Sequence, residues 1–379
     1  MSVDVALLGF GTIGRELARQ LATNARATTR TIRVCAVIDR SGFVHAPGGF
    51  TWKRLMELRA HKAHGDSLAA AGGVAADTAE SIETVTSHRR SPRRSVLVDA
   101  TAAYTAPFLE RAITRGWDLV LANKLPLTDS RVSVERLFAL AEKRKRHLLH
   151  EATVGAGLPV IDTLRKLVES GDQIQSIEGC PSGTLGFIFG ELGRGARFSD
   201  ALRRAMIAGY TEPDPREDLG GADVARKALI LGRLIGFRGE LGDMAVESLV
   251  PEALTASPCA EFLHRVKEID ERWNERVANA ARRGSVLRYR ARVTRRAINV
   301  GLVEVDAASA LGALAGTDNQ FAFTTTRYRD QPLVISGPGA GAAVTAAGVY
   351  NDILAIAAAE HRRAKRVGTS ARSRRSIPA

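Results

Sequence analysis

An acidic segment that ends in a lysine is the part of the sequence best suited to chemistry. Residues 209–227 read GYTEPDPREDLGGADVARK and contain five carboxylates, in a chain whose formal net charge is +13. Two prolines and two adjacent glycines interrupt the segment, which makes it poor material for a strand or a core helix. It predicts a shaped loop that leads into a helix with an apolar stripe from Val224 to Ile235.

Asp223 and Lys227 stand four residues apart at the start of that helix, so their side chains share one face. Such a pair is often an exposed ion pair that stabilises a helix only slightly. Because an acidic loop precedes this pair, the carboxylates of the segment have three possible roles: they could bind the ammonium group of a small substrate, keep a surface loop solvated, or hold a hard cation. Prolines stand where a calcium loop would turn, so ammonium binding ranks first and metal binding last.

A glycine-rich motif near the N-terminus predicts a dinucleotide site. An apolar strand over residues 3–8 runs into the motif and a helix follows, which is the context that such a site requires. The first glycine makes the turn, the second lets the pyrophosphate approach, and the third lets the helix pack on the strand. The first helical residues present backbone N–H groups to the phosphates. The motif is Gly9-Phe-Gly11-Thr12-Ile13-Gly14.

Polar residues stand at the carboxyl ends of the next strands. In a doubly wound sheet, residues at these strand ends line the crevice that binds the ligand. A strand over residues 32–38 ends at Asp39, whose carboxylate there would bond the adenosine ribose and favour NAD. Arg40 beside it would pair with a 2′-phosphate and favour NADP, so the choice between NADH and NADPH stays open. Thr101 and Lys124 follow two further apolar strands and are expected to face the cofactor and the substrate.

The expected fold class is α/β, with a Rossmann doubly wound parallel sheet and a second α+β catalytic and dimerisation domain. The first domain covers residues 1–149 and the second covers 150–316. Residues 317–360 are expected to return to the first domain and form a C-terminal helix, and 361–379 to form a basic disordered tail. The second domain is predicted as a mixed sheet with helices on one face and strands over 174–179, 286–293 and 298–305.

Composition narrows the location and the partners. With 45% hydrophobic and 25% charged residues the chain is typical of soluble globular proteins. No membrane-spanning run and no signal peptide is expected, so the predicted location is cytoplasmic, with no membrane partner. Seven of the thirteen net positive charges lie in residues 362–379, a tail without aromatics, so no specific nucleic-acid partner is expected. The three cysteines are far apart and indicate neither a disulfide framework nor a zinc site.

Taken together, these motifs resemble the homoserine dehydrogenase family, from residue 3 to about residue 358. The matching segments occur in the family's order: Gly9 to Gly14, ANKLP at 122–126, EATVGAGLP at 151–159, Ser182-Gly-Thr184, 209–227, and GPGAGAAVTAAG at 337–348. The family reduces L-aspartate 4-semialdehyde to L-homoserine with NADH or NADPH, at the branch toward threonine, isoleucine and methionine.

The resemblance implies roles for residues of the acidic segment. Glu212 and Asp223 would bind the amino and hydroxyl region of homoserine, together with Asp218 and Thr184. Lys227 would give the proton to the carbonyl oxygen.

Further roles rest on the resemblance alone. Lys124 would approach the reacting oxygen and the nicotinamide, and which of the two lysines transfers the proton stays open. Gly209 and Gly341 would contact the cofactor. A monovalent cation, Na⁺ or K⁺, would be held by the Glu151 carboxylate and the backbone carbonyls of Val154, Ala156 and Leu158.

The segment at 180–191 is closer to the form found in fused aspartokinase and homoserine dehydrogenases. The chain is nevertheless expected to be a stand-alone homodimer, without the kinase and without threonine feedback through a C-terminal regulatory domain. Two alternatives are an aspartate-semialdehyde-type dehydrogenase with Cys180 as its nucleophile and a non-catalytic nucleotide-binding protein. No histidine stands in a motif that would make it the base for Cys180, whereas the lysines and carboxylates named above are all present.

Overall fold

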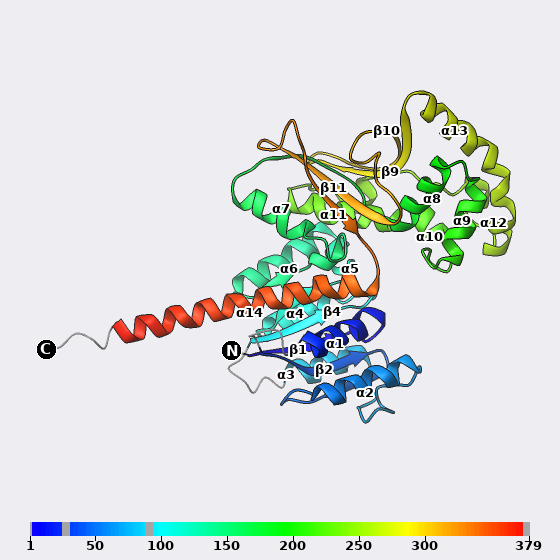
Figure 1. Cartoon of the computed structure of the whole chain (residues 1–379). Helices are drawn as coiled ribbons and strands as arrows, with labels where there is room; N and C mark the ends of the chain where they lie inside the picture. Colours follow the sequence, from blue (N-terminus) through cyan, green and yellow to red (C-terminus); the bar gives the residue numbers. More distant parts are fainter. Residues whose placement is uncertain (1, 25–30, 88–93, 374–379) are drawn as a thin grey trace. The chain divides into compact units, whose positions relative to one another are not determined.

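The computed structural model describes residues 2–24, 31–87 and 94–373. The chain forms two compact units (Figure 1). Unit 1 combines Met1–Thr153 with Thr345–Ala379, and unit 2 consists of Val154–Val344. Each unit has its own six-stranded sheet.

The sheet of unit 1 has the strand order β3-β2-β1-β4-β5-β6. All neighbouring pairs are parallel except β2 with β3. The central strand is buried from Val3 to Leu8, because helices cover both faces of a parallel sheet. The predicted Rossmann doubly wound sheet is therefore confirmed. The strands are β1 Ser2–Leu8, β2 Thr31–Asp39, β3 Gly42–His45, β4 Arg94–Asp99, β5 Asp118–Leu121 and β6 Leu148–Leu149.

Helices follow the strands of unit 1, and a helix from the far end of the chain joins them. This last helix, α14 Ala342–Ser373, contributes Val349, Ile353 and Ile356 to the same core as Val3 and Val5 (Figure 1). The other helices are α1 Thr12–Asn24, α2 Trp52–Ala63, α3 Thr78–Ser87, α4 Ala106–Thr114, α5 Leu125–Thr128, α6 Arg131–Lys143 and the 3₁₀ turn η1 Glu151–Thr153.

The first part of α14 is more apolar than sequence analysis expected. By length and composition alone, Ala342–Ala359 is sufficient to cross a membrane, with a mean hydropathy of 1.5. In the structure its buried residues, among them Ala346 and Tyr350, pack in the core of unit 1. Of Ala342–Ala359, 39% is buried, and packing inside the protein thus explains the apolar character of this buried face.

Unit 2 contains a mostly antiparallel sheet with the order β12-β11-β7-β9-β10-β8, in which only β8 pairs in parallel. One face carries the buried apolar residues, such as Ile177, Phe321 and Phe323, and helices α8, α11 and α13 contact its strands. The strands are β7 Ile174–Cys180, β8 Ala245–Val246, β9 Ser285–Val293, β10 Ile298–Asp306, β11 Asp318–Thr325 and β12 Leu333–Pro338. The helices are α7 Val160–Glu169, α8 Gly183–Gly193, α9 Phe198–Ile207, α10 Arg216–Leu219, α11 Ala222–Leu234, α12 Cys259–Arg265 and α13 Asp270–Arg282.

The segment expected to return to the first domain, 317–360, is divided between the two units. Its first part forms β11 and β12, and β11 pairs with β7 in the sheet of unit 2. The chain joins unit 1 only from Thr345 onward. Helix α14 then continues to Ser373, beyond residue 361 where a disordered tail was expected, and residues 374–379 lie outside the described part.

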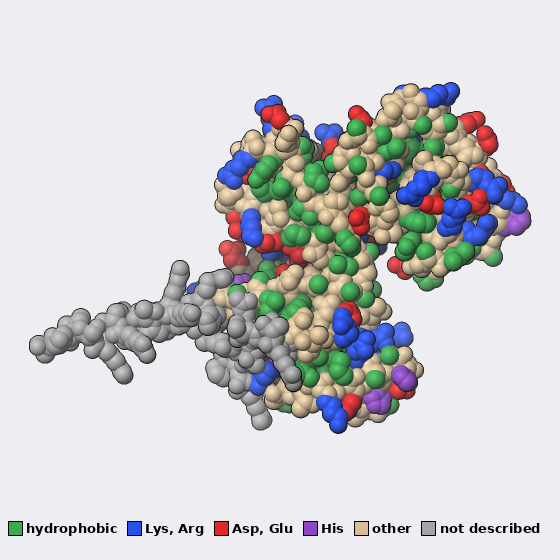
Figure 2. All heavy atoms as spheres, in the orientation of Figure 1, with side chains coloured by type: hydrophobic (Ala, Val, Ile, Leu, Met, Phe, Trp, Pro, Cys, Tyr) green, Lys and Arg blue, Asp and Glu red, His purple; other side chains and the backbone are tan. Residues whose placement is uncertain are grey.

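Basic and acidic side chains lie together on the part of unit 2 that carries α9 (Figure 2). The ion pairs there are Arg194–Glu191, Arg204–Glu191, Arg197–Asp200 and Arg203–Asp200. Because carboxylates compensate these arginines, this surface differs from the continuous basic stripe that nucleic acid requires.

Candidate active site

The glycine loop of unit 1 has the geometry that a pyrophosphate needs. Gly9 has a φ of +92°, and a Cβ there would lie 2.8 Å from the carbonyl of Ala100. A Cβ on Gly14 would lie 2.1 Å from the Gly9 oxygen, so α1 packs directly on the loop. A Cβ on Gly11 would meet nothing within 4 Å. The loop is therefore tight where the protein packs on itself and open where a ligand would approach, at the start of α1 with Thr12 and Ile13.

The carboxylate of Asp39, at the end of β2, is already occupied by protein partners. One oxygen accepts hydrogen bonds from the Ser41 amide and hydroxyl at 2.7 and 2.6 Å. The other lies 2.9 Å from Nζ of Lys62, at the end of α2. Both side chains of this ion pair are largely buried, and exposed Arg40 follows Asp39 in the chain. The acid predicted to contact a ribose is thus neutralised by a lysine.

A buried carboxylate organises the ends of β4 and β5. Asp99 accepts hydrogen bonds from the Thr101 amide, the Thr105 hydroxyl and the Asn123 amide group at 3.0, 2.5 and 3.0 Å. Burial raises the pKa of Asp99, while the bonds from Thr105 and Thr101 oppose that shift. Asn123 in turn accepts from the Leu125 amide at 3.0 Å. This network fixes the backbone on both sides of Lys124, which precedes α5.

In unit 2, the acidic loop is held by a second carboxylate. Asp218 accepts the amide hydrogen of Glu212 at 2.8 Å. The Thr184 hydroxyl lies 3.0 Å from Asp218 and 2.5 Å from the carbonyl of Tyr210. Partial burial raises the pKa of Asp218, and the charge of nearby Asp223 adds to that shift. Asp218 and Thr184 therefore set the position of Glu212, which is exposed.

Lys227 is fixed by two acceptors near the start of α11. Its Nζ lies 2.8 Å from the Asp223 carboxylate and donates to the carbonyl of Pro181 at 2.6 Å. The lysine side chain is 12% exposed and that of Asp223 is 48% exposed. An ammonium group has three hydrogens, so one remains for a further acceptor. Lys227 is thus largely buried and has a second acceptor, unlike the lysine of an ordinary exposed helix ion pair.

Another acid of the loop has a structural role. Arg216 forms an ion pair with Asp214 at 2.5 Å, which lowers the pKa of that carboxyl. The same guanidinium donates to the carbonyls of Leu254 and Ser257 at 3.3 and 2.5 Å. Asp214 thereby anchors the loop on the segment that precedes α12.

The residues predicted to hold a cation have unusual backbone geometry. Gly155 and Ala156 have φ values of 78° and 56°, and the second is costly for a residue with a side chain. The Leu158 carbonyl accepts a hydrogen bond from Val160 at 2.8 Å. Glu151 is buried, and its amide donates to Asp352 of α14 at 2.9 Å. In the described ranges no three His, Cys, Asp or Glu side chains form a metal-binding group, so a cation here would depend largely on backbone carbonyls.

The remaining glycines predicted to contact the cofactor both have left-handed backbones. Gly209 ends the turn after α9 with a φ of 69°, and Gly341 directly precedes α14 with a φ of 104°. A Cβ on Gly209 would meet nothing within 4 Å. Their role toward a cofactor stays a prediction.

Comparison with known proteins relates this geometry to a family. A model described as the NAD binding domain of homoserine dehydrogenase matches residues 9–151, and the homoserine dehydrogenase model matches 159–354. Homoserine dehydrogenase of Emericella nidulans is 39% identical in an alignment that covers 93% of this chain and 98% of that protein. The chain belongs to the homoserine dehydrogenase family.

Other family members differ in length or in sequence. Bifunctional aspartokinase/homoserine dehydrogenase 1 of Zea mays is 38% identical over 94% of this chain, but the chain spans only 38% of that protein's length. A hyperthermophilic archaeal homoserine dehydrogenase in complex with NADPH shares the fold, with a TM-score of 0.73 and 24% identity over 93% of this chain and 97% of that chain.

Neither membership of the homoserine dehydrogenase family nor the local structure supports the alternative enzyme with Cys180 as its nucleophile. Cys180 is buried at the end of β7, and burial raises the pKa of its thiol to about 12. A neutral thiol is a poor nucleophile at physiological pH.

The sequence alone did not reveal the positioning residues Lys62 and Asp99. Asp99 does end a buried strand, which was the available signal, whereas Lys62 carries no motif.

Proposed function

We propose that the protein is an oxidoreductase that reduces L-aspartate 4-semialdehyde to L-homoserine with NADPH. The observation that carries this proposal is the fixed ammonium group of Lys227, held between Asp223 and Pro181 beside an acidic loop. The reaction would supply the synthesis of threonine, isoleucine and methionine.

Lys227 would act as the proton donor. Reduction of an aldehyde requires a hydride at carbon and a proton at oxygen, and the bound nicotinamide supplies the hydride. Two hydrogens of the Lys227 ammonium are engaged by Asp223 and Pro181, and the third would bond the carbonyl oxygen and then transfer. In the reverse direction the neutral amine would accept the hydroxyl proton of homoserine. Lys124 would help to orient the reacting oxygen.

The acidic loop would recognise the ammonium group of the amino acid. Glu212 is exposed and its backbone is fixed by Asp218, so only its side chain would have to be ordered when its carboxylate binds the ammonium group. Asp223 would contact the substrate while it holds Lys227. We assign Asp218 and Thr184 to positioning the loop, because their polar atoms already bond to each other and to its backbone.

The surroundings of Asp39 favour NADPH. An unpaired carboxylate would repel a 2′-phosphate, but Lys62 neutralises Asp39, and Arg40 adds a second positive charge. A 2′-phosphate would therefore meet net positive charge. The archaeal relative solved with NADPH is consistent with this choice.

Several expectations complete the proposal. A monovalent cation would bind the buried carboxylate of Glu151 and the carbonyls of Val154, Ala156 and Leu158, where two consecutive left-handed residues turn the chain. We further propose a cytoplasmic homodimer with no membrane partner and no specific nucleic-acid partner.

A set of alcohols tests the proposal. Purified protein with NADP⁺ should oxidise L-homoserine, and 4-hydroxybutyrate, which lacks the ammonium group, should lose at least a hundredfold in kcat/KM. In Glu212→Gln, KM should rise for homoserine but not for 4-hydroxybutyrate. The difference in kcat/KM between the two alcohols should therefore become smaller. Equal rates with both alcohols, or no oxidation of homoserine, would refute the proposal.

A further inference from the structure

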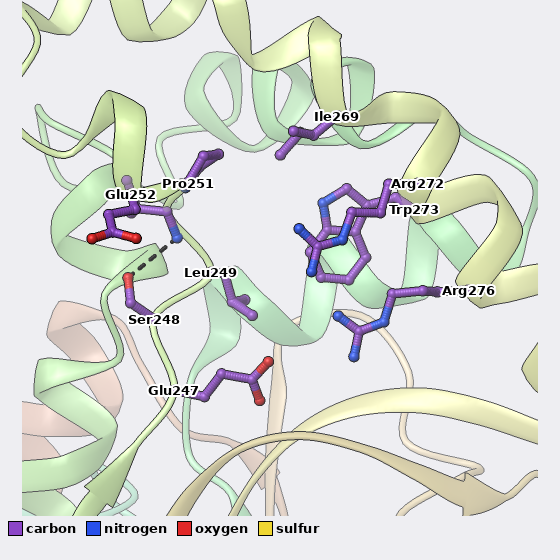
Figure 3. Close-up of a pocket in the computed structure, with 10 residues that line it drawn as sticks. Glu247, Ser248, Leu249, Pro251, Glu252, Ile269, Arg272, Trp273 and Arg276 are labelled. Carbon is purple, nitrogen blue, oxygen red and sulfur yellow. Dashed lines mark hydrogen bonds between the residues drawn. The ribbon is translucent and has the colours of Figure 1, made fainter.

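A cavity of about 170 Å³ lies in unit 2 between the segment 247–252 and helix α13 (Figure 3). One wall is made by 247–252 and the other by Ile269, Arg272, Trp273 and Arg276. None of these residues belongs to the active site described above. The lining combines apolar residues with the guanidinium groups of Arg272 and Arg276 on α13 and the carboxylates of Glu247 and Glu252 on the other wall. Such a cavity is suited to a small ligand whose anionic end lies on the arginine side.

The two arginines are four residues apart on α13, and Figure 3 shows both head groups directed from the helix into the cavity. Arg276 lies over the indole of Trp273, at 5.2 Å from the ring centroid. That indole is 5% exposed and stacks on Phe198 with 4.9 Å between centroids. Arg276 therefore rests on a rigid aromatic base, and less side-chain entropy would be lost when it binds an anion.

The charges that line the cavity are separated. In the described part of the chain, neither Arg272 nor Arg276 forms an ion pair with a carboxylate. On the opposite wall the Glu247 carboxylate instead accepts the Leu302 amide hydrogen at 2.8 Å. Guanidinium groups without a carboxylate partner at a partly enclosed site favour an incoming carboxylate, which they bind through charge-assisted hydrogen bonds.

The wall of this cavity is attached to the acidic loop. The amide of Leu249, whose side chain lines the cavity, donates to the carbonyl of Leu219 at 2.9 Å. Leu219 is the last residue of α10, within the acidic loop. Arg216 of the same loop bonds to the carbonyl of Leu254, in the turn Glu252–Leu254 that continues the wall. A ligand that moves or fixes 248–252 would thus act on the acidic loop directly.

We propose that this cavity binds a small organic carboxylate with an apolar body, and that its occupancy alters the affinity of the acidic loop for the amino-acid substrate. The carboxylate bonds Arg272 and Arg276, and the apolar body contacts Leu249 and Ile269. The effect on the loop rests on the proposed function, whereas binding itself does not.

Calorimetric titration with three compounds of similar shape tests the binding step. The full-length protein should bind 3-methylbutanoate and L-valine in saturable fashion, and 3-methylbutylamine, which lacks the carboxylate, should not bind. If valine binds more tightly than 3-methylbutanoate, and Glu247→Gln weakens its binding, the natural ligand also carries an ammonium group. If 3-methylbutanoate binds more tightly than valine, the natural ligand is a simple anion. Either order supports a carboxylate site.

Matched variants locate the site. Arg272→Met/Arg276→Met should weaken carboxylate binding at least tenfold, whereas Arg282→Met, on the same helix but outside the cavity, should stay within twofold. Circular dichroism checks that each variant is folded, and Arg276→Lys should retain partial binding. Absence of carboxylate binding, or equal binding to the double variant, would overturn the proposal.

Hydrogen exchange separates this inference from the proposed function. Saturating carboxylate should slow exchange of the Leu249 amide at least threefold and change KM for homoserine at least twofold, and neither effect should occur in the double variant. If homoserine is not a substrate while binding and slowed exchange persist, only the proposed function fails. If homoserine is oxidised but carboxylates do not bind, only the present inference fails.

Discussion

At the scale of single residues, the charged side chains of the candidate site are held in place by ion pairs with partners of opposite charge. Lys227 is held by Asp223, and Asp39 is neutralised by Lys62. The sequence predicted the first pair because its members are four residues apart on one helix. It could not predict the second, because Lys62 meets Asp39 only after α2 has folded beside β2, and no motif marks that lysine.

The ion pair of Lys62 with Asp39 should decide the choice of cofactor. In Lys62→Ala, the unpaired Asp39 carboxylate would face the 2′-phosphate, and we expect KM for NADPH to rise at least tenfold with little change for NADH. Steady-state kinetics with both cofactors measure this. Lys53→Ala removes an exposed charge from the start of the same helix and serves as the control. A parallel loss for NADH would indicate a purely structural role.

Cys180 should be dispensable for catalysis. With a thiol pKa of about 12, caused by burial, it is protonated throughout the range in which the enzyme would work. We expect Cys180→Ser to keep kcat within a few fold in steady-state assays. Loss of all turnover in a folded Cys180→Ser protein would revive the cysteine mechanism.

At the scale of elements, the acidic loop is shaped by its contacts with other strands and helices. Prolines and glycines in the sequence predicted a loop, and the structure confirms it, with the short helix α10 inside. Strand β11 was not predicted, since it opens with Asp318, Asn319 and Gln320, which are unfavourable in strands. Asn319 and Gln320 are nevertheless buried, because pairing with β7 and β12 determines their conformation.

Gly221 joins the acidic loop to α11 and should not tolerate a side chain. Its φ is +72°, and a Cβ would lie 2.0 Å from the Tyr289 hydroxyl oxygen. Gly221→Ala should lower the free energy of unfolding by about 1–3 kcal/mol and raise KM for homoserine. Urea unfolding measures the first effect. Gly193→Ala in α8, where a Cβ meets nothing within 4 Å, should be neutral or stabilising, and equal losses in both would contradict this account.

At the scale of the whole molecule, unit 1 is completed by the end of the chain. Sequence analysis predicted a C-terminal helix that packs on the first domain, and the structure places α14 in the core of unit 1. It began the returning segment at residue 317, ahead of Thr345, because β11 pairs with β7, which is far away in the sequence, and local patterns do not show such a pairing.

The packing of α14 should therefore support the cofactor domain. Ile353 is fully buried, and Ile353→Ala should lower the free energy of unfolding by about 2–5 kcal/mol through lost burial and a cavity. Val132→Ala, at a position that is 64% exposed in the same unit, should change it by less than about 0.5 kcal/mol. Thermal unfolding with and without NADPH measures both. A negligible effect of Ile353→Ala would show that α14 is not part of this core in solution.

The most direct test of the proposed reaction is the consumption of NADPH in the presence of L-aspartate 4-semialdehyde. The wild-type protein should oxidise NADPH only when the aldehyde is present. Lys227→Ala should lower turnover by about 10²–10⁴-fold while NADPH affinity, measured by calorimetry, stays unchanged. NADPH oxidation without the aldehyde, or wild-type turnover in Lys227→Ala, would contradict the assignment of Lys227 as the proton donor of a semialdehyde reductase.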